Sequence, residues 1–328
     1  MRAVICRAWG EVEDLTLEDI ASPQPGPDEV LIDVKATAVN YADALMVAGR
    51  YQTRPAFPFS PGLETAGVVT QCGAGVTRFT PGDRVMAILP YGGLAEQAVA
   101  SQDETFAIPD GMPFEAAGAF PIAYISSHVA LRWQGRLVAG ETLLVLGAAG
   151  GVGLTAVEIG KAMGARVIAA ASTAEKLAVA QEHGADDLIN YTAEPLTARV
   201  MSLTNDVGAD VCFDPVGGDL FDAALSSLGW GGRILLVGFV GGVPRIPAHR
   251  LLVKNRSALG CTLRYYRWYA PDKLRTSVAE LCQWYQAGKL NPCITHRLPL
   301  ERSIEAIRLL TDRQAYGKVV IIPTLSAD

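Results

Sequence analysis

An apolar segment runs directly into a glycine-rich turn near the middle of this 328-residue chain. Residues 142–146 read TLLVL, and the string GAAGGVG follows at 147–153. Glycine lets a backbone turn tightly and approach a phosphate, and the free N–H groups at the start of the next helix attract its negative charge. The order of strand, glycine turn and helix predicts a dinucleotide pocket, with a pyrophosphate held by Gly150, Gly151, Val152 and Gly153.

The glycine spacing is GxxGxxG rather than the usual GxGxxG, so the flanking sequence carries the prediction. Residues 151–163 continue as a helix that ends at Gly164, and residues 165–171 read ARVIAAA, which is typical of a second buried strand. The whole segment has the length of a strand–helix–strand unit.

The end of that second strand indicates which coenzyme is bound. A site selective for NAD normally places Asp or Glu there to bind the ribose 2′-hydroxyl, whereas this chain has Ser172 and Thr173, with Lys176 close behind. A hydroxyl donates to a 2′-phosphate and an ammonium neutralises it, so the sequence favours NADPH. In the alternative interpretation, Ser172 and Thr173 cap a helix that begins near Ala174, and Lys176 is solvated on its first turn.

The regions on either side of this unit differ in pattern. Strand signals at 30–36, 67–72 and 83–89, separated by Pro-Gly and Gly-Gly turns, predict a mostly β region over the first 120 or so residues. Residues 121–261 alternate strand and helix, which predicts a six-stranded parallel sheet covered on both faces. Helices at 271–287 and 303–311 and a strand at 318–322 then return to the first region.

Composition excludes several classes of function. The net charge of −6, with charged residues at only 19% and no basic stripe, argues against a nucleic-acid partner. No apolar run approaches the length of a membrane span, and the first residues lack a signal-peptide core, so we expect a cytoplasmic protein without a membrane partner. The six cysteines form no CxxC pair, which favours reduced thiols over a cysteine-rich zinc lobe.

Several strings resemble one family. They are NYAD at 40–43, PGLETAG at 61–67, PGDRV at 81–85, GADDLINY at 184–191 and DPVGG at 214–218. Together they resemble the medium-chain dehydrogenase/reductase superfamily, and within it the zinc-independent, zeta-crystallin-like NADPH:quinone oxidoreductase branch. The resemblance implies a GroES-like catalytic domain over 1–120, a Rossmann NADP-binding domain over 121–262 and a C-terminal segment, 263–328, that returns to the catalytic domain.

The same resemblance bears on metal binding. Zinc-dependent relatives carry Cys-His and Gly-His-Glu where this chain has Asn40-Tyr41 and Gly62-Leu63-Glu64. Asn and Leu cannot replace a thiolate and an imidazole, and the four histidines are scattered, so we expect no metal site. Glu64 is then left without a metal; it is structural or pairs with an arginine.

A metal-free site suits acceptors that delocalise charge onto their own oxygens, such as quinones and activated alkenes. The resemblance places Asn40 and Tyr51 above the nicotinamide, where an amide and a phenol donate to the developing oxyanion, and Asp43 orients them. Aromatic packing is the alternative for Tyr51, and a helix N-terminal cap is the alternative for Asp43.

The resemblance implies further coenzyme contacts on the nucleotide domain. These are Ser126, Tyr191, Gly238, Phe239, Val240 and Leu263. Phe239 is alternatively a packing residue at an interface. Lys318 either joins the site or lies on a polar face.

An aromatic and basic segment, LRYYRWY at 263–269, departs from the family pattern. Its rings either stack on a planar quinone or pack between subunits or domains. Arg264 and Arg267 alternatively meet the phosphates of a coenzyme A ester.

The sequence therefore predicts a zinc-free reductase that passes reducing equivalents from NADPH to quinones or similar conjugated carbonyl compounds. A 2-enoyl-thioester or enone reductase is the first alternative, and a catalytically silent NADPH-binding redox sensor or structural protein is the alternative from another class. Relatives pair the edges of their nucleotide domains, so we expect a homodimer.

Overall fold

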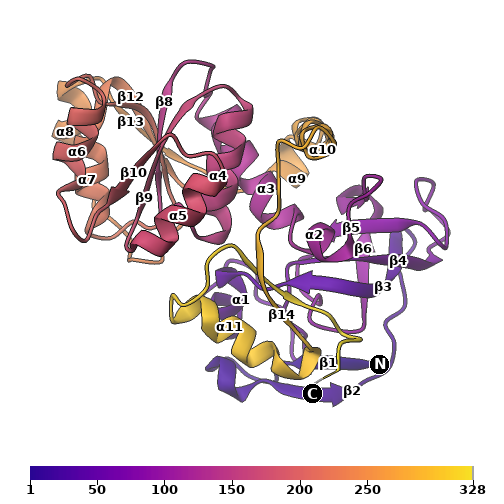
Figure 1. Ribbon diagram of the computed structural model, residues 1–328. Coiled ribbons are helices and arrows are strands. Elements are labelled where there is room, and N and C mark those ends of the chain that lie inside the picture. The colour runs from indigo at the N-terminus through magenta and orange to yellow at the C-terminus, as the bar shows by residue number, and fades with distance from the viewer. Residues whose placement is uncertain (327–328) are drawn as a thin grey trace. The chain divides into compact units, whose positions relative to one another are not determined.

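The computed structural model describes residues 1–326, so the last two residues of the predicted C-terminal segment lie outside the described residues. The chain forms two compact units (Figure 1). The first unit comprises Met1–Ile122 and the C-terminal segment that begins at Pro292, and the second unit comprises Ala123–Asn291.

The second unit contains a six-stranded sheet in which every neighbouring pair is parallel, in the order β10-β9-β8-β11-β12-β13. Its strands are β8 (Thr142–Leu146), β9 (Arg166–Ala171), β10 (Asp187–Asn190), β11 (Ala209–Asp214), β12 (Leu228–Leu236) and β13 (Ser257–Gly260). The strand order reverses between β8 and β11, and ligands of open α/β sheets bind at such a switch point. The predicted six-stranded parallel sheet is confirmed.

Helices cover both faces of this sheet: α4 and α5 lie on one face and α6, α7 and α8 on the other (Figure 1). The helices of this part of the chain are α3 (Pro121–His128), the π-helical segment Val129–Gln134, α4 (Gly151–Ala162), α5 (Ala174–Glu182), α6 (Leu196–Leu203), α7 (Leu220–Ser226), α8 (Ala248–Val253), α9 (Tyr266–Tyr269) and α10 (Pro271–Gln286). The apolar strands fill a core that includes Leu144, Ile168 and Phe221. This burial explains why the strands read as continuous apolar runs.

The first unit is mostly β. Its main sheet has the order β14-β15-β3-β4-β5-β7, and β6 also pairs with β3. The strands are β1 (Arg2–Ile5), β2 (Thr16–Asp19), β3 (Glu29–Ala38), β4 (Glu64–Cys72), β5 (Arg84–Ile88), β6 (Gln97–Ser101), β7 (Thr105–Ala107), β14 (Ile294–Leu298) and β15 (Lys318–Ile321). The helices are α1 (Tyr41–Val47), α2 (Phe114–Gly118) and α11 (Ser303–Thr311), with 3₁₀ turns at Val12–Asp14, Gln102–Glu104 and Leu300–Arg302.

The return of the C-terminus to this unit positions the site described below. β15 pairs antiparallel with the end of β3, with Val320 opposite Ala38 and Ile321 opposite Thr37. Lys318, the first residue of β15, therefore lies beside the turn that leads from β3 into α1.

The segment 263–291 belongs with the second unit, whereas the family resemblance predicted that the nucleotide domain ends at 262. The physical reason is the apolar face of α10, on which Leu274, Val278 and Leu281 are buried. Trp133 also donates a 2.9 Å hydrogen bond from Nε1 to Ser277 Oγ. Among residues 1–326, no helix is both long and apolar enough to cross a membrane.

Candidate functional site

The glycine turn after β8 has the geometry that a pyrophosphate site needs. Gly147 has a φ of +56°, and Gly150 N donates to Gly147 O at 2.9 Å, which closes the turn. A Cβ added at Gly153 would lie 2.2 Å from Gly147 O. Because real Cβ atoms do not approach a backbone oxygen this closely, only glycine lets the first turn of α4 pack on the end of β8.

The start of α4 offers donors to an anion. The first helical hydrogen bond runs from Leu154 N to Gly150 O at 2.8 Å, so the N–H groups of 151–153 precede the helical ladder. The first turn carries no acidic side chain. These residues fit the pyrophosphate of a dinucleotide.

The residues that follow β9 have different contacts, and these show which residue caps the next helix. Thr173 Oγ1 accepts from Lys176 N at 3.3 Å, so Thr173 is the residue that caps α5. Ser172 is half-buried, and its carbonyl accepts from Thr192 Oγ1 at 3.0 Å. Tyr191 N donates to Ala171 O at 3.2 Å, which places Tyr191 beside Ser172. The structure thus brings Ser172, Lys176 and Tyr191 together at the carboxyl ends of β9 and β10.

Ser126 lies half-buried on α3, next to a buried hydroxyl that fixes the helix. Ser127 Oγ donates to Val152 O at 2.9 Å and lies 2.8 Å from Thr155 Oγ1. These bonds hold α3 against the first turn of α4, so Ser126 is close to the glycine turn.

The remaining predicted contacts follow β12 and β13. Phe239 and Val240 are exposed, Gly238 is half-buried, and Leu263 is buried at 9% exposure. The loop after β12 is tied to the loop after β11, because Gly241 N donates to Val216 O at 2.7 Å.

Asp214, at the end of β11, is a residue to which sequence reasoning gave no role. Its Oδ1 accepts from Val216 N and Gly217 N, both at 2.8 Å. Its Oδ2 is buried and has no hydrogen-bond partner within the described part of the chain. Burial raises the pKa of this carboxyl, although the two backbone donors oppose the change.

The first unit contains a buried polar cluster formed by Asn40, Glu64 and Lys318. Lys318 Nζ donates to Asn40 Oδ1 at 2.7 Å and to Glu64 Oε1 at 2.9 Å. Asn40 Nδ2 donates to the same Glu64 Oε1 at 2.9 Å. Glu64 is fully buried and Lys318 is 5% exposed. Glu64 therefore pairs with a lysine rather than an arginine.

The second oxygen of Glu64 extends this cluster to the start of α3. Glu64 Oε2 accepts from Ile122 N at 2.8 Å. Both carboxylate oxygens are thus satisfied, as a buried charge requires. The sequence gave Glu64 no catalytic role, and these contacts agree with a positioning role.

Asp43 holds the backbone beneath this cluster. Its carboxylate accepts from Asn40 N at 2.7 Å and from Gly62 N at 3.1 Å, and the side chain has no exposed surface. Complete burial raises the pKa of Asp43 from 3.8 to about 7, against the opposing effects of these donors and of Lys318. Asp43 therefore performs the helix-capping role that the sequence left open.

The raised pKa of Asp43 predicts a pH-dependent stability. Because the folded protein binds this proton more tightly than the unfolded chain, the contribution is complete below about pH 3.8 and is lost as the pH rises through about 7. From pH 5 to pH 8, the free energy of unfolding of wild type should fall relative to that of Asp43→Asn by roughly 3 kcal/mol. Urea denaturation at both pH values measures this; a difference between the two proteins that does not change with pH would contradict it.

Tyr51 is half-buried and packs against the apolar core of the first unit, which includes Phe59 and Met46. This is the packing role that the sequence left open. The hydroxyl as a donor to the acceptor stays a prediction.

Three rings of the aromatic segment that includes α9 are exposed. Tyr265, Trp268 and Tyr269 are 49%, 54% and 83% exposed. The Arg264 and Arg267 guanidinium carbons lie 5.5 and 5.3 Å from the centre of a Trp268 ring. The segment therefore forms a local cation–π cluster on the second unit.

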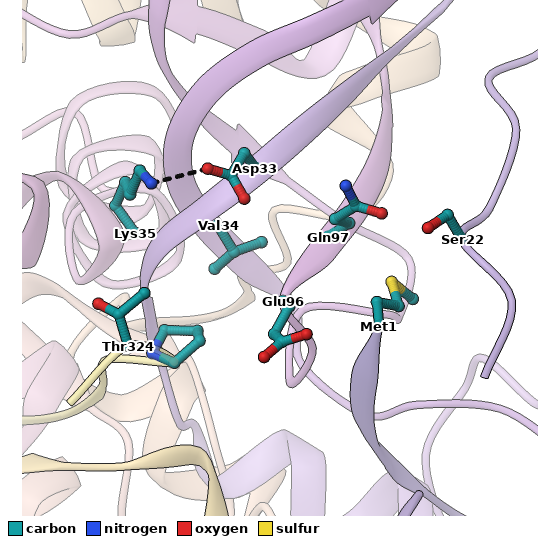
Figure 2. A pocket seen from close by; sticks show the side chains of 9 residues that line it. Met1, Ser22, Asp33, Val34, Lys35, Glu96, Gln97 and Thr324 are labelled. Atoms are coloured by element: carbon teal, nitrogen blue, oxygen red, sulfur yellow. Dashed lines mark hydrogen bonds and ion pairs between the residues drawn. The ribbon is translucent and has the colours of Figure 1, made fainter. Parts of the chain in front are cut away.

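Residues 1–326 contain no group of three or more His, Cys, Asp or Glu side chains arranged to hold a metal ion. A cavity of about 420 Å³ lies elsewhere on the first unit, lined by residues of β3 and β6, by Met1 and Ser22 and by residues 323 and 324 (Figure 2). Its charged groups are already paired: Lys35 Nζ lies 2.7 Å from Asp33 Oδ2, and Arg2 Nε lies 2.7 Å from Glu96 Oε1. None of the predicted site residues lines it.

Two family models match the chain. The alcohol dehydrogenase GroES-like domain matches residues 26–110, and the zinc-binding dehydrogenase model matches residues 151–282. The first match agrees with the predicted GroES-like fold of the mostly β unit.

Named relatives match almost the whole chain. A quinone oxidoreductase-like protein 2 homolog of Nematostella vectensis is 39% identical over 98% of this chain and 88% of the relative. A quinone oxidoreductase of Pseudomonas aeruginosa is 33% identical over 96% of this chain and 98% of the relative. The crystal structure of Escherichia coli quinone oxidoreductase complexed with NADPH superposes with a TM-score of 0.92 at 27% identity, covering 98% of this chain and all of that one.

Proposed function

The chain belongs to the medium-chain dehydrogenase/reductase superfamily, in its quinone oxidoreductase-like branch, and on this premise we propose that it reduces quinones with NADPH. The observation that carries the proposal is the pairing of an intact coenzyme turn with an acceptor site whose metal-ligand positions hold Asn40 and Leu63. A bound NADPH supplies a hydride from its nicotinamide ring.

The chain's own residues bind and select that coenzyme. The backbone N–H groups of residues 151–153 hold the pyrophosphate, and the glycines of the turn, Gly150 included, leave room for its close approach. Ser172 and Lys176 bind the 2′-phosphate, and Tyr191 lies beside the adenosine end. Ser126 and the loop at 238–240 border the nicotinamide, with Leu263 as an outer contact.

The acceptor is held in the first unit without a metal. A quinone places the developing negative charge on its own oxygen, so hydrogen-bond donors suffice where an alcohol dehydrogenase needs a Lewis acid. Asn40 and Tyr51 supply these donors, and Asp43 fixes the backbone of Asn40 through the 2.7 Å bond. Asn and Leu are not zinc ligands, which supports a zinc-independent reaction despite the name of the second family model.

Steady-state NADPH oxidation with 1,4-benzoquinone, 9,10-phenanthrenequinone, an enone and crotonyl-CoA tests this proposal. We expect the quinones to give the highest kcat/KM. Preference for crotonyl-CoA would identify an enoyl-thioester reductase, and the half-buried Arg264 and Arg267 are the groups that would meet its phosphates. Tight NADPH binding without turnover on any acceptor would identify a sensor or structural protein.

Coenzyme selection gives a direct prediction for Lys176. In Lys176→Glu a carboxylate faces the 2′-phosphate and repels it, whereas NADH has no such group. The KM for NADPH should therefore rise about 100-fold while the KM for NADH changes less than about threefold. Glu182→Lys, at the far end of α5, is the matched charge control. Equal effects on both coenzymes would show that Lys176 does not contact the phosphate.

We further propose a homodimer formed along β13. This strand is an edge of the six-stranded sheet, and edge strands expose unpaired backbone groups. Trp230, Leu252 and Val253, on β12 and α8, are 78%, 78% and 75% exposed. Light scattering of the purified protein should give twice the chain mass, and Trp230→Glu should shift it toward the monomer; a monomeric wild type would refute the dimer.

A further inference from the structure

The ammonium group of Lys318 is buried in the polar cluster with Asn40 and Glu64. It is 5% exposed, and its three donors point at Asn40 Oδ1 at 2.7 Å, Glu64 Oε1 at 2.9 Å and Val39 O at 3.4 Å. An ammonium has three donors and no acceptor, so these contacts account for all of them. Lys318 therefore has no donor left for a substrate and can act only through a neighbour.

That neighbour is the side-chain amide of Asn40, which the cluster holds in one orientation. Its oxygen receives the short bond from Lys318, so its nitrogen faces Glu64 Oε1 at 2.9 Å. Within residues 1–326, the other N–H of Asn40 meets only the carbonyl of Ala38, at 3.4 Å, which is a weak contact. Asn40 itself is half-buried, whereas its two charged partners are buried. This second N–H is the one that an acceptor oxygen can take.

A cation on an amide oxygen strengthens the N–H groups at the other end of the amide. Charge-assisted hydrogen bonds are shorter and about twice as strong as neutral ones, and bonds in a chain polarise one another in a low-dielectric environment. The bond from Lys318 draws electron density from the Asn40 nitrogen through the conjugated amide. Glu64 balances the lysine charge in the resting site. Their mutual attraction offsets the desolvation cost of burying the two charges without a metal.

We propose that Lys318 is a positioning residue that orients and polarises the amide of Asn40, so that Asn40 Nδ2 stabilises the negative charge developing on the acceptor oxygen. The inference rests on the proposed quinone reductase function. In the step, the acceptor gains a hydride from NADPH, the coenzyme is oxidised to NADP⁺, and the acceptor oxyanion takes one proton from water. Lys318 keeps its own proton throughout and supplies a fixed field.

Loss of the Lys318 charge and a general disturbance of the site would both lower kcat. The two effects differ in how the loss of kcat depends on the acceptor. Strongly oxidising quinones stabilise the charge by themselves, whereas weakly oxidising quinones depend on the protein donor. The slope of log kcat against acceptor reduction potential therefore reports the donor strength, and a merely structural loss would move all acceptors equally.

The experiment measures kcat for wild type, Lys318→Met and Lys318→Arg on a series of methyl-substituted 1,4-benzoquinones at saturating NADPH. We expect Lys318→Met to lose about tenfold on the strongest oxidant and about 1000-fold on the weakest, where the loss reaches that seen on removal of one oxyanion donor. Lys318→Arg keeps the charge and should retain the wild-type slope. Lys35→Met is the matched control, because Lys35 pairs with Asp33 at the surface, 2.7 Å apart. If Lys318→Met does not fold, Glu64→Gln/Lys318→Met removes both charges of the pair and should show the same steeper slope.

A second readout does not depend on turnover. In protein labelled with ¹⁵N-asparagine, the Asn40 side-chain amide should shift upfield in Lys318→Met and stay near its wild-type position in Lys318→Arg. A uniform rate loss across the quinones would overturn the inference, and so would an Asn40 resonance that is unchanged in Lys318→Met. Absence of wild-type turnover on every quinone would overturn the proposed function instead, while the amide resonance would still test the polarisation.

Discussion

Gly153→Ala should both destabilise the second unit and weaken NADPH binding by about 100-fold, the loss typical of a displacement of about 1 Å in a binding group. The added Cβ would lie 2.2 Å from Gly147 O and 2.9 Å from Gly147 C. Both atoms are backbone, so the turn itself must move, and overpacking of this kind costs roughly 1–3 kcal/mol. The N–H groups that we propose to hold the pyrophosphate move with it.

Gly150→Ala in the same turn separates the two effects. Its φ is −75°, and its Cβ would lie 3.3 Å from Gly147 O, so the turn has to move by only a few tenths of an ångström to accept the methyl group. We expect a melting temperature within about 2 °C of wild type, with any loss of affinity arising from contact with the coenzyme. Thermal unfolding and NADPH fluorescence titration measure both quantities. A Gly153→Ala protein as stable as wild type would contradict the close packing of β8 and α4.

Glu64→Ala should lower the free energy of unfolding by about 3–5 kcal/mol, because it leaves the buried charge of Lys318 without its counter-ion. The same change removes the acceptor for Ile122 N and for Asn40 Nδ2, which lie 2.8 and 2.9 Å from the carboxylate. Buried donors that lose their acceptor add their own desolvation cost.

Two variants control for this effect. Asp33→Ala removes one partner of the surface pair with Lys35 and should cost no more than about 1 kcal/mol. Glu64→Ala/Lys318→Met removes both buried charges and should recover a large part of the loss, since a well-packed apolar pair often replaces a buried ion pair at little cost. Chemical denaturation gives the three values. Additive losses in the double variant would show that the two charges do not interact.

The fold of the second unit, which contains the glycine turn, could be predicted largely from local sequence. Glycine spacing and apolar runs are short-range features, so the turn after β8 and all six strands could be predicted, and the structure confirms the parallel sheet. The residue that caps α5 could not be predicted, because Ser172 and Thr173 have the same capping chemistry. Only backbone geometry shows that Thr173 accepts from Lys176 N and leaves the Ser172 hydroxyl for another partner.

The proposed acceptor site depends on long-range contacts that no local pattern encodes. Asn40 and Lys318 meet because β15 pairs with β3, and a pairing across that much chain leaves no periodic signal. One signal was present: β15 reads KVVI, and a lysine at the start of a fully apolar strand needs a buried partner. The same limit explains why the predicted domain boundary at 262 differs from the structure. The apolar face of α10 does not indicate, from sequence alone, which unit it packs against.

Chelator dialysis followed by an assay of NADPH oxidation with 9,10-phenanthrenequinone tests the central claim, that this protein reduces quinones with NADPH and without a metal. We expect the dialysed protein to contain no stoichiometric zinc and to keep the kcat/KM of the untreated protein. Loss of turnover on dialysis with recovery on adding zinc, or no turnover before dialysis, would contradict the account.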